Sequence, residues 1–206
     1  MTRVCVYVDG FNLYFGLKSK GWRRHYWLDL ATLSTALLKS EQQLETVHYF
    51  TSRIRTTGKN QQDMQRQTCY LEALETLPGL VTHFGRYLEK PRTCLYCGAN
   101  WMGYEEKMTD VNIAVQMLND AFADRFDVAI LISGDSDLTT PLQTLRQQFP
   151  TKRLIVAFPP GRKSTDLSNA AHGFFTIGEA HLRQSQLPAQ VMRKDGFVLQ
   201  RPSSWR

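Results

Sequence analysis

The sequence has no long hydrophobic run. Its amino-terminal stretch, "MTRVCVYVDG", holds only five consecutive apolar residues before its first acidic residue. Five residues are too few for the hydrophobic region of a secretory signal, and far too few for a bilayer-spanning helix, which takes about 20. We therefore expect a cytoplasmic protein that does not enter a membrane.

Cysteine is scarce, with four cysteines among 206 residues. In a cytoplasmic chain such residues are thiols or metal ligands more often than disulfides. Cys94 and Cys97, in "TCLYCGANW", have the spacing of half a zinc site, but a structural Zn²⁺ needs four ligands. Cys5, Cys69 and His83 are the candidates to complete it, and a homodimer could supply a second cysteine pair. A turn with two unliganded thiols is the alternative.

Two common catalytic patterns are also missing. The stretch "PPGRKST" has neither the glycines nor the length of a phosphate-binding P-loop. No Ser, His and acid arrangement typical of a catalytic triad is present. The five histidines are scattered along the chain, and His48 and His83 fall inside expected strands, so we interpret them as structural.

Basic residues exceed acidic ones. The chain has 25 Lys and Arg against 19 Asp and Glu, which gives a net charge of +6. This balance favours a polyanionic partner such as nucleic acid, although a basic protein without such a partner is the alternative. The length suits one domain, which we expect over residues 1–182, with a surface excursion at 87–106 and a basic tail at 183–206.

Short, unbroken apolar runs alternate with stretches of helical spacing. Continuous apolar runs are typical of parallel strands that are covered on both faces, and their alternation with helices indicates βαβ units. The sequence therefore predicts an α/β fold, a doubly wound and mostly parallel sheet of order about 3-2-1-4-5 with helices on both faces. The expected strands are Val4–Val8, Val47–Thr51, Leu80–Phe84, Val128–Ile132 and Leu154–Phe158, with a last short strand at Phe174–Ile177.

Four aspartates occupy related places in this pattern. Asp9 follows the first expected strand, and Asp135 and Asp137 follow the fourth in "LISGDSDLT". Asp110 opens the helix that leads into the fourth strand. Because parallel strands end at one edge of a sheet, and ligands bind at that carboxyl edge, we expect the four acids to converge there.

Each of these acids also has a local explanation. Asp9 could form an Asx turn, Asp110 could favour a helix N-terminus, and Asp137 could cap the following helix. Considered together, two carboxylates about 4 Å apart repel by roughly 4 kcal/mol at an effective dielectric near 20, which a cation would relieve. Mg²⁺ or Mn²⁺ is the fitting ion because it is hard, prefers oxygen and keeps waters.

Basic residues follow the strands at the same expected edge. They are Arg53 and Arg55 after the second strand, Arg86 after the third, and Arg162 and Lys163 after the fifth. Cations around an acidic, metal-binding centre suit a phosphodiester substrate, although a solvated surface base is the ordinary alternative.

Aromatic and basic residues are mixed over residues 22–27, "WRRHYW". Such a composition suits stacking on the unpaired bases of single-stranded RNA. Packing of the same rings in the core is the alternative interpretation.

Three motifs, "YVDGFNLY", "EEKMTDVNIAVQML" and "ILISGDSDLTTPLQTLR", resemble those of NYN-domain proteins, the PIN-like nuclease group that includes the LabA-like (DUF88) proteins. The resemblance covers most of residues 3–180. It implies a PIN-like sheet and a ribonuclease that uses Mg²⁺ or Mn²⁺ to activate water against RNA. Residue by residue, it implies catalytic, metal-binding acids at Asp9, Asp110, Asp135 and Asp137, with Asn12, Ser133 and Glu106 beside them.

Three other readings use the same acids. A phosphohydrolase with Asp9 as nucleophile would need a second acid two residues later, where this chain has Phe11. A Toprim-like enzyme would have Glu in place of Asp9. A non-catalytic RNA-binding or protein-binding module could keep the acids without turnover.

Overall fold

The computed structural model describes residues 1–54 and 60–205. At positions 87, 89, 102 and 104–106 it describes the backbone without the side chains. Arg55, expected to bind substrate, and the side chain of Glu106, expected near the acids, therefore lie outside the described residues.

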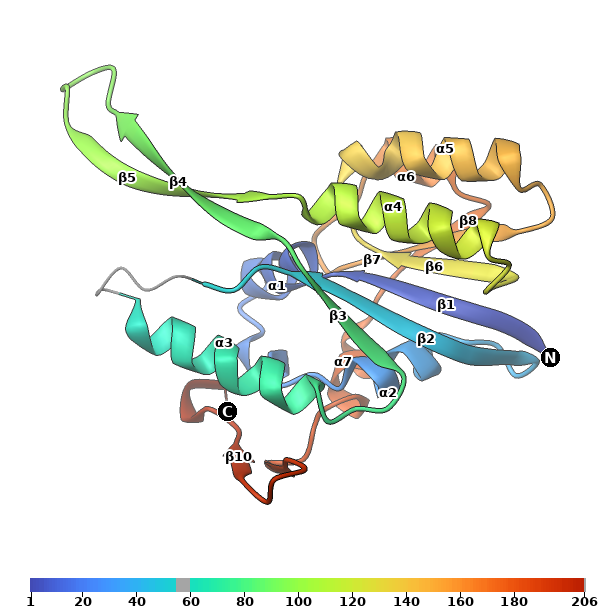
Figure 1. The fold of residues 1–206 in the computed structure, drawn as a ribbon, viewed down its shortest axis with the longest axis horizontal. Coiled ribbons are helices and arrows are strands. Elements are labelled where there is room, and N and C mark those ends of the chain that lie inside the picture. The colour runs from blue at the N-terminus through green and yellow to red at the C-terminus, as the bar shows by residue number, and fades with distance from the viewer. Residues whose placement is uncertain (55–59, 206) are drawn as a thin grey trace.

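A six-stranded sheet of order β3-β2-β1-β6-β7-β8 forms the centre of the molecule (Figure 1). Every pairing in it is parallel. The predicted order of 3-2-1-4-5 is therefore confirmed, and the short final strand adds a sixth position at the edge. The strands are β1 (Thr2–Asp9), β2 (Gln42–Thr51), β3 (Leu80–Phe84), β6 (Val128–Ile132), β7 (Arg153–Phe158) and β8 (Gly173–Thr176).

Helices cover both faces of this sheet, as Figure 1 shows. One face carries α4 (Thr109–Phe122), α5 (Thr139–Gln148) and α6 (Thr165–Ala170). The other carries α1 (Gly10–Ser19), α2 (Leu30–Ala36), α3 (Gln61–Leu74) and α7 (Glu179–Gln184). Short 3-10 turns are η1 (Arg23–His25), η2 (Ser136–Leu138) and η3 (Ser203–Trp205). None of the described helices is long and apolar enough to cross a membrane.

The central strand β1 shows why the sequence folds in this way. Val4, Val6 and Val8 pack under α1, α2 and α3, whereas Cys5 and Tyr7 pack under α4 and α5. Because side chains alternate across a strand and both faces are covered, an unbroken apolar run is what such a strand requires.

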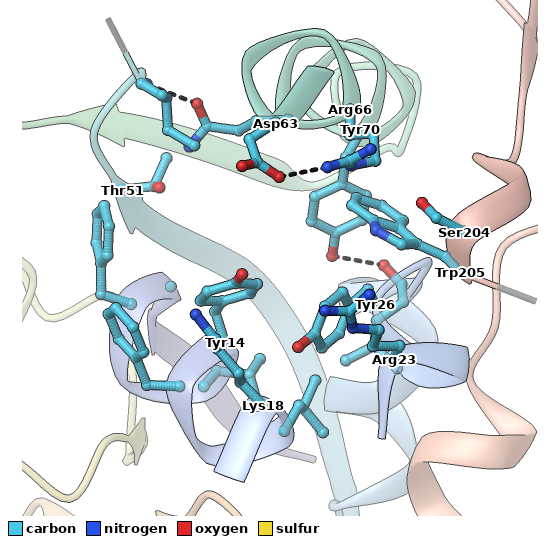
Figure 2. Close-up of a pocket in the computed structure, with 18 of the residues that line it drawn as sticks. Tyr14, Lys18, Arg23, Tyr26, Thr51, Asp63, Arg66, Tyr70, Ser204 and Trp205 are labelled. Atoms are coloured by element: carbon cyan, nitrogen blue, oxygen red, sulfur yellow. Dashed lines mark hydrogen bonds and ion pairs between the residues drawn. The ribbon is translucent and has the colours of Figure 1, made fainter. Parts of the chain in front are cut away.

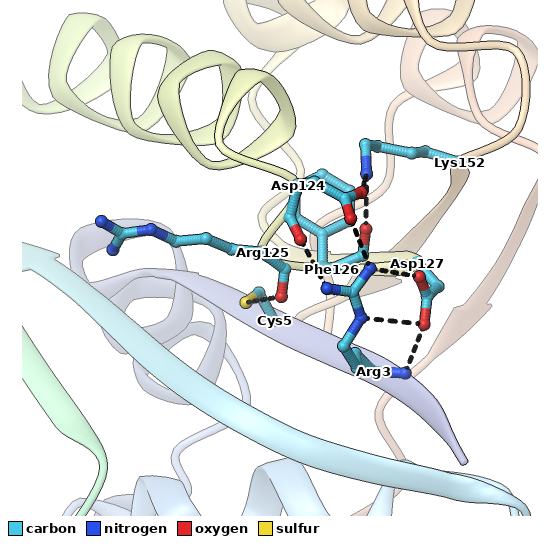
Figure 3. Close-up of polar contacts among 7 residues, drawn as sticks. All are labelled: Arg3, Cys5, Asp124, Arg125, Phe126, Asp127 and Lys152. Atoms are coloured by element: carbon cyan, nitrogen blue, oxygen red, sulfur yellow. Dashed lines mark hydrogen bonds and ion pairs between the residues drawn. The ribbon is translucent and has the colours of Figure 1, made fainter.

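An ion-pair cluster ties the amino ends of β1 and β6 together (Figure 3). The Arg3 backbone N–H and guanidinium donate to Asp127 at 2.7 Å, and the guanidinium also reaches Asp124 at 3.1 Å. Lys152 donates to Asp124 and to the Phe126 carbonyl, each at 2.7 Å. The hydrogen bonds from Arg3 hold the pKa of Asp127 at about 2. These contacts fix the β1–β6 register, so both strands end together at the opposite edge.

The carboxyl-terminal segment, expected to be a basic tail at 183–206, is folded against the domain. It contains β9 (Gln190–Met192), β10 (Val198–Gln200) and η3. Leu187, Val191 and Leu199 are buried around Trp27, whose indole N–H donates to the Pro188 carbonyl at 2.7 Å. These apolar residues show no regular period because they reach Trp27 from separate short elements, so the sequence pattern did not reveal their packing.

Residues 87–106, interpreted as a surface excursion, lie in a two-stranded antiparallel ribbon of β4 (Arg86–Thr93) and β5 (Asn100–Lys107). The ribbon projects away from the sheet (Figure 1). Its turn holds Cys94 and Cys97, which flank the exposed Leu95 and Tyr96.

A buried carboxylate joins α4 to β1 and β2. Asp120 is fully buried and accepts from the Tyr7 hydroxyl at 2.8 Å, from Gln116 Nε2 at 2.9 Å and from His48 Nε2 at 3.1 Å. Burial alone would raise the pKa of Asp120, but the hydrogen bonds from His48, Gln116 and Tyr7 lower it. His48 Nδ1 in turn lies 2.9 Å from His83 Nε2, a pairing that the scattered histidines did not suggest.

We predict that Asp120→Ala lowers the free energy of unfolding by about 3 kcal/mol, because it leaves the buried donors of Tyr7 and His48, and the half-buried Gln116 amide, without their shared acceptor. Urea unfolding followed by tryptophan fluorescence measures this change. Glu41→Ala, which removes an exposed carboxylate, is the control and should change stability by less than about 0.5 kcal/mol. Equal stability of the two variants would show that the network contributes little.

Candidate functional site

The site is built around Asp9, the last residue of β1 and the N-cap of α1. Asp9 is 3% exposed. Its Oδ1 accepts from the Asn12 backbone N–H at 3.0 Å, and its Oδ2 accepts from the Ser133 hydroxyl at 2.8 Å. Asp9 therefore has a local role, as the sequence allowed, but as a helix N-cap where an Asx turn was considered, and this role holds the carboxylate in one orientation.

A second set of hydrogen bonds joins the ends of β1 and β6. Asn12 Oδ1 accepts from the Gly134 N–H at 2.9 Å, and Ser133 Oγ accepts from the Asp135 N–H at 3.0 Å. Ser133 is fully buried. Asn12 and Ser133, expected beside the acids, thus link the two strand ends on which Asp9 and Asp135 lie.

The other three acids approach from η2 and α4. Asp135 caps η2, with its Oδ1 accepting from the Asp137 N–H at 3.0 Å. Asp110 lies in the first turn of α4, directly after a sharp turn at Met108, which has a left-handed φ of 80°. That conformation is uncommon outside glycine, and here it turns the chain from β5 into α4.

The electrostatics of the acids show that they share one environment. Burial raises the pKa of Asp9 to about 6, and the charges of Asp110 and Asp135 add to this, while the hydrogen bonds from Asn12 and Ser133 oppose it. Burial and the charges of Asp135 and Asp137 also raise the pKa of Asp110. We call Asp9, Asp110, Asp135 and Asp137 the acid rim.

The side chains of the acid rim do not by themselves form a complete set of ligands for a metal ion. Among the described residues, no three His, Cys, Asp or Glu side chains are grouped so that they could hold one metal ion. Mg²⁺ does not need such a cage, since it usually keeps several waters and uses one or two carboxylates. A buried carboxylate whose pKa is raised, beside other carboxylates, supplies the oxygen donors that a hard cation prefers. The residues therefore fit a largely hydrated Mg²⁺ or Mn²⁺.

The expected basic residues differ in their relation to the rim. A Cβ at Gly134 would meet the Arg162 backbone and Cβ at 3.0 to 3.1 Å, so the loop after β7 lies against the rim. Arg53 instead lies over the Phe84 ring at 4.6 Å and beside Glu75.

Two further bases lie at the margins of this edge. The Lys163 ammonium is 5.2 Å from the centre of the Phe174 ring. Arg86 is exposed at the start of β4. Strand order predicts which edge of the sheet a base is near, but it does not predict the direction in which a long side chain points.

The cysteines do not form a complete zinc site in the described part of this chain. Cys94 and Cys97 are free, and hydrogen bonds from the Cys97 and Tyr96 backbone lower the pKa of Cys94. Of the candidates to complete the site, Cys5 is buried in β1, Cys69 contacts the Gln200 carbonyl from α3, and His83 pairs with His48. A zinc site at the ribbon would need ligands from elsewhere.

A cavity of about 670 Å³ lies between α1, α3 and η3 (Figure 2). The sequence did not predict it, because Trp205 on one wall comes from the segment interpreted as a tail. Tyr26, in the mixed aromatic and basic stretch, is a second wall residue and is mostly buried. Packing of the rings in the core, the alternative interpretation of this stretch, therefore holds for the fully buried Trp27. Tyr26 is also buried, but it lines the cavity as well.

Comparison with known proteins shows the family of this chain and a solved structure of similar fold. The sequence model of the NYN domain matches residues 3–178. The chain is 26% identical over 241 positions to the 6-hydroxy-3-succinoylpyridine 3-monooxygenase HspA of Pseudomonas putida (strain DSM 28022 / S16), covering 98% of this chain and 75% of that protein. A crystal structure of a protein of unknown function from Vibrio parahaemolyticus RIMD 2210633 is similar in fold, with a TM-score of 0.54 and 18% identity over 90% of this chain and 96% of that one.

We predict that Asp9 makes the metal-free protein less stable as pH rises. Its pKa is about 6 in the folded chain and about 3.9 when unfolded, so the folded state binds the proton more tightly between those values. The free energy of unfolding should fall by about 2 kcal/mol between roughly pH 4 and pH 7 through this group alone. Urea titrations in a chelator across this range, for the wild type and Asp9→Asn, measure it. Parallel pH profiles for the two proteins would contradict the assignment.

Proposed function

Because the chain belongs to the NYN domain family, we propose that it is a divalent-metal-dependent ribonuclease that hydrolyses phosphodiester bonds of single-stranded RNA. The observation that carries the proposal is the acid rim at the carboxyl edge of a parallel sheet, where burial and the charges of neighbouring rim acids raise the pKa of Asp9 and of Asp110. Carboxylates that destabilise one another in this way favour a bound cation.

Asp9, together with Asp110 or Asp135, would hold a largely hydrated Mg²⁺ or Mn²⁺ through one or two carboxylates, and the other rim acids, Asp137 among them, would act directly or through water. When bound, the ion supplies a water of lowered pKa and neutralises charge on the leaving oxygen. Asn12 and Ser133 keep the Asp9 carboxylate in one orientation through their hydrogen bonds. No side chain is proposed as a nucleophile.

The charge of the whole chain supports a polyanionic substrate. The net charge is +6, and the loop carrying Arg162 and Lys163 lies against the rim. Phosphates on either side of the scissile bond would bind to such bases, and binding would weaken as salt rises. Arg53 and Lys163 lie over the rings of Phe84 and Phe174, and Arg86 is exposed at the start of β4, where these bases would contact a longer strand.

A second candidate function is turnover of a small heteroaromatic acid. The relative from Pseudomonas putida is named as a monooxygenase of 6-hydroxy-3-succinoylpyridine, and it aligns with nearly the whole of this chain. The cavity beside α1 is of a size and composition that would suit such a molecule. The identity of 26% is too low to carry that substrate over by itself, so we rank this function second.

We predict that the wild type cleaves labelled single-stranded RNA in Mn²⁺ and that Asp135→Asn lowers the rate by about 100-fold or more, because it removes a rim carboxylate. Gel electrophoresis of the products measures the rate. Glu41→Gln is the matched control, since it removes an exposed carboxylate at the far edge of the sheet and should leave the rate unchanged.

Three outcomes separate the alternatives. Equal cleavage by the wild type and Asp135→Asn would reject the acid rim as the catalytic site. Binding of RNA by the wild type without cleavage in Mn²⁺ or Mg²⁺ would indicate a non-catalytic binding module. Absence of both binding and cleavage would favour the small-molecule candidate.

A further inference from the structure

The first turn of α1 separates the acid rim from the cavity. Asp9 and Asn12 face the rim, where they contact Ser133 and Gly134. Gly10, between them in sequence, lines the cavity. Adjacent Cα atoms are about 3.8 Å apart, so the rim and the cavity begin at neighbouring residues of one chain turn.

The cavity wall is largely aromatic. Tyr14, Tyr26, Tyr70 and Trp205 surround it in Figure 2. The Tyr14 and Tyr26 ring centres are 5.0 Å apart, and Trp205 lies 5.6 Å from Tyr26 and 6.0 Å from Tyr70. Tyr14 remains 40% exposed, so part of this side chain is accessible to a ligand. Flat rings of this kind bind other flat rings by stacking.

The cavity also carries positive charge. Lys18, Arg23 and Arg66 line it, together with one acid, Asp63, which pairs with Arg66. Lys18 and Arg23 are exposed, and among the described residues neither of them forms an ion pair. The Lys18 ammonium lies 5.8 Å from the centre of the Tyr14 ring. The ligand that matches this wall is a flat aromatic ring that carries a negative charge.

A nucleotide has that chemistry, and the volume of about 670 Å³ is sufficient for one. Resting on the proposed ribonuclease function, we propose that the cavity binds the base of the nucleotide next to the phosphate at the acid rim. The base stacks on Tyr14, and its own phosphate contacts Lys18 and Arg23. The strand crosses the first turn of α1 between the two sites.

The test is the affinity of a fluorescein-labelled single-stranded RNA octamer, measured by fluorescence anisotropy in a chelator so that no cleavage occurs. Tyr14→Ala and the double variant Lys18→Gln, Arg23→Gln should each weaken binding by about tenfold, in line with loss of a stacked base or of phosphate contacts. Phe122→Ala and the double variant Lys39→Gln, Arg153→Gln are the controls, because they remove an exposed ring or two exposed charges elsewhere. Unchanged affinity in the cavity variants, or equal loss in the controls, would overturn the proposal.

A second arm tests for the base itself. Octamers with one abasic position, moved along the strand, should bind the wild type more weakly at one position and should lose that sensitivity in Tyr14→Ala. Abasic effects that are the same in both proteins would overturn the proposal. Displacement of the RNA by pyridine-3-carboxylate, without displacement by AMP or UMP, would also overturn the proposal, because it would indicate a small-molecule cavity.

This result can be read separately from the ribonuclease assay. Normal octamer binding through the cavity with no cleavage in Mn²⁺ would reject the proposed catalysis and retain the base site. Cleavage that requires Asp135 but is insensitive to Tyr14, Lys18 and Arg23 would retain the catalysis and reject the base site.

Discussion

The structure depends on one buried carboxylate placed where two parallel strands end. Asp9 closes β1, starts α1 and accepts the Ser133 hydroxyl from the end of β6. The ion pairs of Arg3 with Asp127 at the other end of the same strands fix their register, so the two strands end together. Without this alignment, the acids of η2 and α4 would have no common edge to meet at.

Two buried aspartates in this chain illustrate the difference between a structural and a functional carboxylate. Asp120 is surrounded by donors from Tyr7, Gln116 and His48, and its pKa is lowered. Asp9 receives only two hydrogen bonds, and its burial, with the charges of Asp110 and Asp135, raises its pKa to about 6. Both are almost fully buried, so their surroundings and not burial alone decide the sign. A buried acid whose charge the fold does not balance is a candidate for binding a cation.

The sequence predicted the features that follow from backbone periodicity. Unbroken apolar runs gave the parallel sheet and its order, and parallel order placed Asp9 and Asp135 at one edge. The sequence could not predict contacts that depend on the direction of a side chain, or packing between a few apolar residues that are far apart in the chain. Arg53 turns toward Phe84, and His48 meets His83 across neighbouring strands. The segment after Pro188 has no period, yet it buries Val191 and Leu199 and supplies Trp205 to the cavity.

The position of the cavity bears on how one fold can serve different substrates. The sheet and its acid edge follow from the family pattern, whereas the cavity wall combines α1 and α3 with Trp205 from beyond the matched residues 3–178. A nucleotide and a pyridine carboxylic acid share a flat ring and a negative charge, so this wall alone would accept either. Only the nucleotide within a strand also presents a neighbouring phosphodiester to the acid rim. In the proposed scheme, choice of substrate therefore depends on whether one molecule occupies both sites, which lie on either side of the first turn of α1.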